Sequence, residues 1–188
     1  MVRELKHHEK KLLRKVDFHT YKTDNNHREH AIRARYHLQD AMEYKKYNAI
    51  CGNLRQLAHK LSELDPTSDP VRKKVEGEVL DKLWRMGILK QSREQGAGLS
   101  RVEKEVTVSA FCRRRLAVVM VRTGMVQTVK AAATFVEGGH VRVGTEVVND
   151  PAFLVTRNME DFVTWIDSSK IKRNIMRYHE NLDDFDLM

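Results

Sequence analysis

The most regular hydrophobic pattern in the chain lies in its first half and predicts a long helix. Apolar residues recur at alternating steps of three and four between residues 47 and 64, which is the period of one helix face. The stripe consists of Tyr47, Ile50, Leu54, Leu57, Leu61 and Leu64. Asp65 and Pro66 end the pattern, because the residue before a proline disfavours the helical conformation. The stripe spans too few heptads to indicate a coiled coil, so we expect it to pack within the domain.

A second helix is predicted directly after the first. Asp69 offers a side-chain acceptor for the cap, and Pro70 suits the first helical position. Gly87 is expected to end this helix in a left-handed conformation, with Ile88 folding back onto it. Residues 91–105 contain Gly96-Ala97-Gly98 and scattered charge, and they are the best candidate for a domain boundary. The region 1–105 is therefore predicted to be helical.

Residues 3–18 predict a short basic amphipathic helix. Its apolar residues recur at roughly helical spacing, and they are Leu5, Leu12, Leu13 and Val16. The cations around them include Lys6, Lys10, Lys11 and Arg14. The pattern leaves two roles open, direct contact with a polyanion such as RNA or a solvated face beside a docking stripe. Residues 17–30 are polar and without a period, so we expect a linker there.

Two short helices are predicted between residues 109 and 139. The first begins near Ser109, whose hydroxyl can cap it, and ends at Gly124. Its apolar side leaves Arg114, Arg115 and Arg122 free to face water or a ligand. The second helix is capped by Thr128 and stopped by Gly138-Gly139, and it carries an apolar stripe of Ala131, Ala132, Phe135 and Val136.

A β-hairpin is predicted to follow these helices. Val141 and Val143 alternate with Arg142, the turn falls at Gly144-Thr145, and residues 146–148 return. A short strand is also expected at residues 106–108. The aromatic residues Trp165, Phe153 and Phe162 lie in stretches with an alternating pattern, so core packing is a stronger expectation for them than base stacking.

The sequence therefore predicts an α+β fold in three parts. Residues 1–105 form a helical N-terminal region, and residues 106–167 form a helix-helix-β-hairpin module. Residues 168–188 form a basic amphipathic helix, suited equally to RNA or to packing, and an acidic tail at 183–186 that is more easily explained as a solubilising end than as a docking segment.

Charge and composition narrow the possible partners. The 188 residues carry a formal charge of +8 and a sequence pI of about 9.5, which favours a polyanionic partner. No run approaches the roughly 18 apolar residues of a membrane span, and the first residues are charged, so we expect a soluble protein in a reducing intracellular compartment. The two cysteines, Cys51 and Cys112, form no C-x-x-C pair, and neither is expected to react.

Metal binding and catalysis find no support in the motifs. His27 and His30 have helical spacing but no obvious third ligand, so we expect neither a metal nor another cofactor. A P-loop, a Ser-His-Asp arrangement, paired carboxylates and an HExxH motif are all missing from the sequence. We therefore predict that the chain is not an enzyme.

A family resemblance covers nearly the whole chain. Residues 113–167 closely resemble the small RNA-binding domain named after the primary rRNA-binding protein of the bacterial small ribosomal subunit, which has the helix-helix-hairpin alpha-L motif. The flanking segments look like the eukaryotic branch of this family that works in the U3 small nucleolar ribonucleoprotein, within the small-subunit processome. These segments are residues 1–13, 47–61, 80–89, 106–116 (Val-Thr-Val-Ser-Ala-Phe-Cys-Arg-Arg-Arg-Leu), 151–165 and 183–186.

The resemblance implies which residues contact RNA. In this module RNA meets the N-terminal parts of both helices and the start of the hairpin, where arginine forks and helix dipoles suit phosphates. Carried over by position, these residues are Arg113, Arg114, Arg115, Thr128, Lys130, His140 and Arg142. We add Arg122, which the apolar side of the first helix leaves free to face a ligand. We also add the N-terminal cations Lys6, Lys10, Lys11 and Arg14, because Val129 and Ala133 stand where many relatives have arginines.

The resemblance also implies a function and a place. We expect a ribosome-assembly factor of the nucleus and nucleolus that binds U3 snoRNA and pre-rRNA and promotes their pairing for pre-18S rRNA processing. Its protein partners would be a scaffold phosphoprotein of the U3 snoRNP and other processome proteins, with no membrane and no small-molecule substrate. The alternative is a structural rRNA-binding protein of the mature small ribosomal subunit, and the opening and closing segments favour the first reading.

Overall fold

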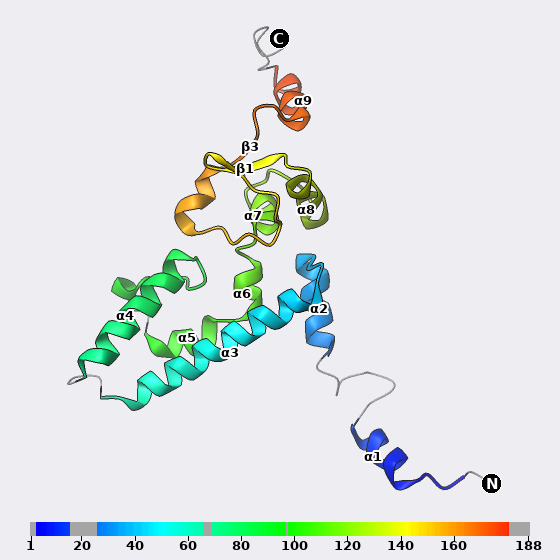
Figure 1. The fold of residues 1–188 in the computed structure, drawn as a ribbon, viewed down its shortest axis with the longest axis vertical. Coiled ribbons are helices and arrows are strands. Elements are labelled where there is room, and N and C mark those ends of the chain that lie inside the picture. The colour runs from blue at the N-terminus through cyan, green and yellow to red at the C-terminus, as the bar shows by residue number, and fades with distance from the viewer. Residues whose placement is uncertain (1–2, 16–25, 66–68, 97, 181–188) are drawn as a thin grey trace. The chain divides into compact units, whose positions relative to one another are not determined.

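The computed structural model describes residues 3–15, 26–65, 69–96 and 98–180, and its chain forms two compact units, Met1–Tyr44 and Lys45–Met188. The α+β prediction is confirmed: helices dominate, and a small antiparallel sheet lies near the C-terminal end (Figure 1). The division of the chain into parts at residues 105 and 167 stays a prediction. None of the described helices is both long and apolar enough to cross a lipid bilayer.

The first unit contains α1 (His7–Lys15), α2 (Asn26–Tyr36) and the first residues of α3 (Ala41–Glu63). The predicted N-terminal helix is confirmed over residues 7–15, and Leu12 and Leu13 lie exposed on it. Val16 lies outside the described residues. Helix α2 begins at Asn26, so the last part of the expected linker 17–30 is helical instead.

Helices α3 and α4 (Pro70–Arg85) occur where the sequence predicts them. The buried residues of α3 are Tyr47, Cys51, Ala58 and Leu61, whereas Ile50, Leu57 and Leu64 of the predicted stripe are exposed. The buried face is therefore rotated from the predicted one. Asp69 caps α4 by accepting from the Val71 amide at 3.0 Å. Gly87 closes its end at φ +73°, and the Ile88 amide donates back to the Leu83 carbonyl at 3.0 Å, as in a Schellman motif.

The stretch between α4 and the module is folded. It contains the 3-10 turn η1 (Arg93–Gln95), α5 (Leu99–Glu105) and α6 (Val108–Cys112). The prediction of a strand at residues 106–108 is wrong, because Thr107 caps α6 by accepting from the Ala110 amide. Phe111 of α6 stacks on Tyr47 of α3 with ring centroids 5.8 Å apart. Arg55 donates to the Val106 carbonyl at 2.9 Å, so this stretch is tied to α3.

The module begins with a break that the sequence does not predict. The helix expected from Ser109 to Gly124 is two helices, α6 and α7 (Leu116–Arg122), separated at the arginine triplet 113–115. Helix α8 (Val129–Glu137) follows, with Thr128 accepting from the Ala131 amide at 3.3 Å as predicted.

The predicted hairpin is confirmed as β1 (Val141–Val143) and β2 (Glu146–Val147), and β3 (Val163–Trp165) pairs on the other side of β1. The antiparallel order β2-β1-β3 places Val141 opposite Trp165 and Val143 opposite Val163. The core of the module is formed by Leu116, Ala117, Val119, Met120, Ala132, Ala133, Val136, Val141, Val155 and Val163.

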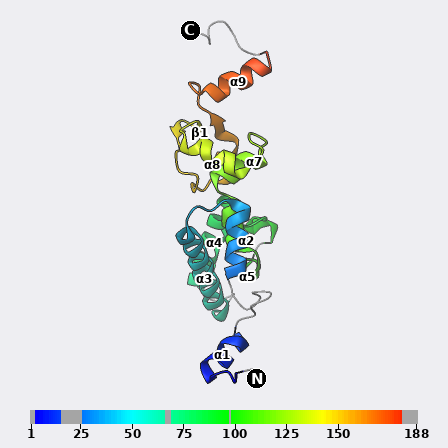
Figure 2. The ribbon, with the colours of Figure 1, turned by 90° about the vertical axis from the view of Figure 1, so that its right-hand side faces the viewer.

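The remaining elements are the 3-10 helix η2 (Arg157–Phe162) and α9 (Lys170–Tyr178), and Figure 2 shows α9 near the C-terminal end of the chain. Ser169 caps α9 by accepting from the Ile171 amide at 3.2 Å. The basic helix expected after the module is thus confirmed over α9, whereas the acidic tail lies outside the described residues. Trp165 packs edge-on against Phe135, and Phe153 contacts the same core, as expected. The prediction that Phe162 packs in the core is wrong, because its side chain is 60% exposed at the end of η2.

Candidate RNA interface

The arginine triplet is mostly hidden, which corrects the expectation that Arg114 and Arg115 face a ligand. Both are buried, at 5% and 2% exposure. The backbone turns at Arg114 and is extended at Arg115. It pairs with residues 153–155, since Arg115 bridges to Leu154 and the Val155 amide donates to the Arg114 carbonyl at 2.8 Å. Because of this pairing the side chains of Arg114 and Arg115 lie inside the protein, and within the triplet only Arg113 has an exposed side chain.

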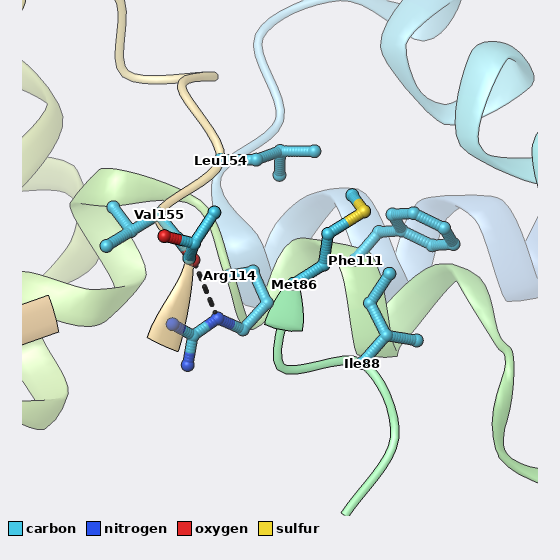
Figure 3. A pocket seen from close by; sticks show the side chains of 7 residues that line it. Met86, Ile88, Phe111, Arg114, Leu154 and Val155 are labelled. Atoms are coloured by element: carbon cyan, nitrogen blue, oxygen red, sulfur yellow. Dashed lines mark hydrogen bonds between the residues drawn. The ribbon is translucent and has the colours of Figure 1, made fainter. Parts of the chain in front are cut away.

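Arg114 is held by two acceptors from the far end of the module. Its Nε donates to the Val155 carbonyl at 2.9 Å, and its Nη1 donates to Glu160 at 2.9 Å. Figure 3 shows the first of these bonds beside a small apolar cavity of about 20 Å³, and it shows the guanidinium pointing away from Met86 and Phe111. Because both hydrogen bonds span more than 40 residues of sequence, Arg114 ties α6 and α7 to the segment after the hairpin.

An open cleft of about 560 Å³ lies on the charged side of Arg114. Its lining contains five cationic side chains and one carboxylate, and we call it the basic cleft. The lining residues are Gly87, Ile88, Lys90, Arg113, Arg114, Arg122, Arg157 and Glu160. The C-terminal turn of α4 therefore faces the arginines of the module across this cleft.

Glu160 bridges two of the arginines in the basic cleft. It accepts from the buried Arg114 and from Arg122, whose side chain is 48% exposed. Burial by itself would raise the pKa of Glu160, but hydrogen bonds and positive charge from Arg114 and Arg122 outweigh this effect and hold the pKa below its ordinary value. Glu160 therefore stays ionised as an internal counterion.

Arg157 closes the cleft on the side of α4. Its guanidinium donates to the Trp84 carbonyl at 2.8 Å and to the Leu89 carbonyl at 2.7 Å, and it lies 5.4 Å from the centroid of the Trp84 ring. The sequence analysis missed Lys90, Arg157 and Glu160. No local periodicity or motif marks these three residues, because their role depends on contacts between distant segments.

A second depression lies beside the sheet, and we call it the hairpin groove. It is lined by Met125, Arg142, Val163, Thr164, Trp165 and Lys172. Arg142 donates to Thr164 at 3.1 Å and through both terminal nitrogens to Asp167, at 2.7 and 3.4 Å. Lys172 of α9 also donates to Asp167, and hydrogen bonding by Lys172 together with the charge of Arg142 lowers the pKa of Asp167.

The other predicted contact residues lie at separate places. Thr128 and Lys130 are exposed at the start of α8, where Thr128 also serves as the cap. His140 is half-buried, with its Nδ1 3.2 Å from the Ser169 hydroxyl. The exposed N-terminal cations Lys6, Lys10, Lys11 and Arg14 belong to the other compact unit. The structure thus brings Arg113, Arg114 and Arg122 together at the basic cleft and leaves Arg142 at the hairpin groove.

The two depressions are linked through the end of α7. Arg122 lines the basic cleft and Met125 lines the hairpin groove, with the turn at Gly124 between them. The stretch from Arg122 to Met125 therefore contributes to the walls of both depressions. Within the described parts of the chain, three or more His, Cys, Asp or Glu side chains never gather as a metal site would require. Cys51 and Cys112 are buried thiols, as expected for Cys51.

Comparison with known proteins agrees with this architecture. The sequence model of the Ribosomal protein S4/S9 N-terminal domain matches residues 4–104, and that of the S4 domain matches residues 114–161. The U3 small nucleolar ribonucleoprotein protein IMP3 of Saccharomyces cerevisiae is 55% identical over 186 residues, which cover 99% of both chains. The human protein of the same name is 49% identical over 188 residues, covering 100% of this chain and 99% of its own.

A more distant relative is the small ribosomal subunit protein uS4 of Metallosphaera sedula. It is 28% identical over 146 residues, which cover 78% of this chain and 77% of its own. The IMP3 proteins are both more similar and matched over more of their length. The chain therefore belongs to the family of U3 small nucleolar ribonucleoprotein proteins named IMP3, and it carries the N-terminal domain of the S4/S9 ribosomal proteins followed by an S4 domain.

Proposed function

We propose that this protein is an RNA-binding ribosome-assembly factor of the U3 snoRNP in the small-subunit processome. It binds U3 snoRNA and pre-rRNA and promotes their pairing for pre-18S rRNA processing. It works in the nucleolus, beside a scaffold phosphoprotein of that particle and other processome proteins, and its part in the process is binding rather than catalysis. The names of the relatives support the assignment of this protein to the U3 snoRNP.

The observation that carries the proposal is the gathering of cations at two depressions joined by one turn. Five cationic side chains line the basic cleft, and Arg142 and Lys172 line the hairpin groove. Such an arrangement suits a ligand with repeated phosphates, because each neutralised phosphate releases condensed counterions. RNA would be recognised mainly by backbone and shape, since guanidinium groups match phosphate oxygens rather than one base.

Strand pairing follows from the same electrostatics. Two RNAs repel each other through their phosphates, and a cationic surface screens that repulsion while it holds both strands in one frame. We therefore expect the full-length protein to increase the rate at which complementary U3 and pre-rRNA strands anneal. The increase should fade as salt screens the surface.

The test uses a variant of the full chain that alters α8, the hairpin and α9 without touching the basic cleft, and we call it the module variant. Lys130, Arg142 and Lys172 are changed to alanine, and a control variant changes the exposed residues Lys60, Lys74 and Lys104 instead. Fluorescence anisotropy with labelled U3 and pre-rRNA fragments is recorded between about 50 and 200 mM salt. We expect the module variant to lose roughly tenfold or more in affinity and to have a shallower salt slope by about two units, while the control changes little.

Equal losses in the two variants would mean that only net charge matters, and no loss in either would remove the start of α8 and the hairpin groove from the interface. The alternative, a structural protein of the mature small subunit, makes a different prediction for sedimentation. An assembly factor should sediment with precursor particles and be missing from translating ribosomes. Its presence in polysomes would favour the alternative.

A further inference from the structure

We propose that the basic cleft is a preformed pocket for one backbone phosphate of RNA, and that Glu160 occupies the place of that phosphate in the free protein. This inference rests on the proposed RNA-binding function and assigns one site within it. The ligand is a phosphodiester group, which has a single negative charge and two non-bridging oxygens. A carboxylate has the same charge and the same pair of acceptor atoms, so it can stand in for the phosphate.

The contacts of Glu160 are those that a phosphate would make. One oxygen accepts from Nη1 of Arg114 at 2.9 Å, and the other accepts from Arg122. Two guanidinium groups from opposite ends of α7 thus converge on one acceptor group. Arginine forks bind carboxylates and phosphates with the same geometry, because both ligands present two oxygens in one plane.

Arg114 also has unused donor capacity. Its side chain is only 6% exposed, and its Nη2 is buried with no hydrogen-bond partner among the described residues. A buried donor without a partner costs free energy, so such a group is a sign of an acceptor that is missing from the free protein. Because Arg114 lines the basic cleft, an entering phosphate is a suitable acceptor once small side-chain shifts expose this nitrogen.

The walls of the cleft hold Arg114 in position. The Val155 carbonyl binds its Nε on one side. On the other side the backbone of Gly87 approaches so closely that an added Cβ would lie 2.8 Å from Nε and 2.9 Å from Cζ. Arg157 fixes this turn of α4 through the Trp84 and Leu89 carbonyls. Arg114 is therefore preorganised, and ordering it on binding costs little entropy.

The remaining cations supply the excess charge. Glu160 is the one carboxylate among the lining residues, against five cationic side chains. The side chain of Arg113 is exposed at the edge of the cleft. Arg122 is half exposed and can turn from Glu160 to a ligand. An additional anion in the cleft thus meets a net positive field even while Glu160 is ionised.

RNA fits this cleft better than a phosphorylated peptide does. A single phosphate would be satisfied by the cleft alone, whereas a polymer of phosphates needs further cations along its path. The turn from Arg122 to Met125 leads to Arg142 and Lys172 in the hairpin groove. The basic cleft and the hairpin groove therefore form two points on one track.

The test changes Glu160 and its partner Arg122 in the full-length protein. Glu160→Gln keeps the shape but removes the competing charge, and Glu103→Gln makes the same charge change at an exposed site outside the cleft. Anisotropy with the RNA fragments described above should give Glu160→Gln about three- to tenfold higher affinity and a salt slope steeper by nearly one unit. Glu103→Gln should stay within about twofold of the unchanged protein.

Arg122→Gln should lower the affinity about fivefold or more, and the double variant Arg122→Gln with Glu160→Gln should gain less than Glu160→Gln alone, because the freed arginine is missing. Thermal unfolding of each variant checks that it is folded. If Glu160→Gln binds RNA like Glu103→Gln or more weakly, the phosphate pocket is wrong. The proposed function would still stand if the module variant had lost affinity, and it would fail if the unchanged protein bound neither RNA.

A phosphoserine peptide provides the last arm of the test. The same peptide without the phosphate serves as its control. The proposal expects the phosphorylated peptide to compete with RNA only weakly, since it lacks the repeated charge that reaches the hairpin groove. Competition by this peptide at concentrations that match the RNA affinity, lost in Arg122→Gln, would assign the cleft to a phosphoprotein and overturn the proposal.

Discussion

Two carboxylates in this protein have nearly the same partners and very different surroundings. Glu160 joins Arg114 and Arg122 in the basic cleft, and Asp167 joins Arg142 and Lys172 at the hairpin groove. The side chain of Arg114 is 6% exposed and that of Glu160 is 25% exposed. At the groove the corresponding values are 34% for Arg142 and 62% for Asp167.

The difference in burial separates two roles for the same chemistry. A buried arginine needs every available acceptor, so the Glu160 network supports the fold and also presets the cleft. An exposed pair is screened by water and salt, and it contributes little to stability. In the proposed RNA complex, the groove would therefore exchange Asp167 for a phosphate at low cost, whereas the cleft would keep its arginines oriented while a phosphate replaces Glu160.

The largest effect is expected from removing the buried arginine. Arg114→Ala should destabilise the fold by about 3 kcal/mol, because it leaves the Val155 carbonyl and Glu160 without their donor and opens a cavity. Arg113→Ala, at the exposed neighbour, should change the stability by less than about 0.5 kcal/mol. Urea unfolding of both variants measures the difference, and equal losses would show that the burial of Arg114 is unimportant.

A smaller effect is expected from crowding the same arginine. Gly87 and Gly124 both have positive φ, of +73° and +79°, so an alanine at either position is strained by roughly 1 kcal/mol. Only at Gly87 would the new Cβ also meet Arg114, at 2.8 Å from Nε. We expect Gly87→Ala to be less stable than Gly124→Ala by about 1–2 kcal/mol. If the two variants unfold at the same denaturant concentration, Arg114 is free to move aside.

The smallest effect is expected in the pH dependence of stability. The pKa of Glu160 is lowered below its ordinary value of 4.5, so its stabilising contribution is complete above about pH 4.5 and is lost as the pH falls through the lower folded value. The free energy of unfolding, measured between about pH 7 and 3, should therefore fall less steeply with falling pH in Glu160→Gln than in the unchanged protein. Asp167→Asn should follow the unchanged protein at high salt, because the exposed carboxylate is screened. A steeper fall in Glu160→Gln would reverse the assigned sign.

The sequence was sufficient for features that depend on neighbouring residues. The Asp69 cap, the Gly87 closure, the Thr128 cap and the turn at Gly144 all occur as predicted, because each is decided within a few residues of chain. The family and the α+β class were also within reach, since motifs and periodicity extend along most of the chain.

The face of α3 shows where periodicity becomes ambiguous. Ile50 and Cys51 are neighbours on the helix, and both fit an apolar stripe. The structure buries Cys51 and exposes Ile50, because the partners of this helix, such as Phe111, come from more than 50 residues away. A pattern on one helix cannot specify which of two adjacent faces its distant partners will cover.

The arginine triplet shows the same limit at the candidate site. Sequence determined that positive charge gathers at residues 113–115, and tertiary structure decided that Arg114 and Arg115 are buried and Arg113 is exposed. The physical reason is the pairing of this stretch with residues 153–155, about 40 positions later, which breaks the expected helix and turns two side chains inward. Charge belongs to the residues themselves, but its exposure depends on which distant backbone groups and carboxylates fold against it.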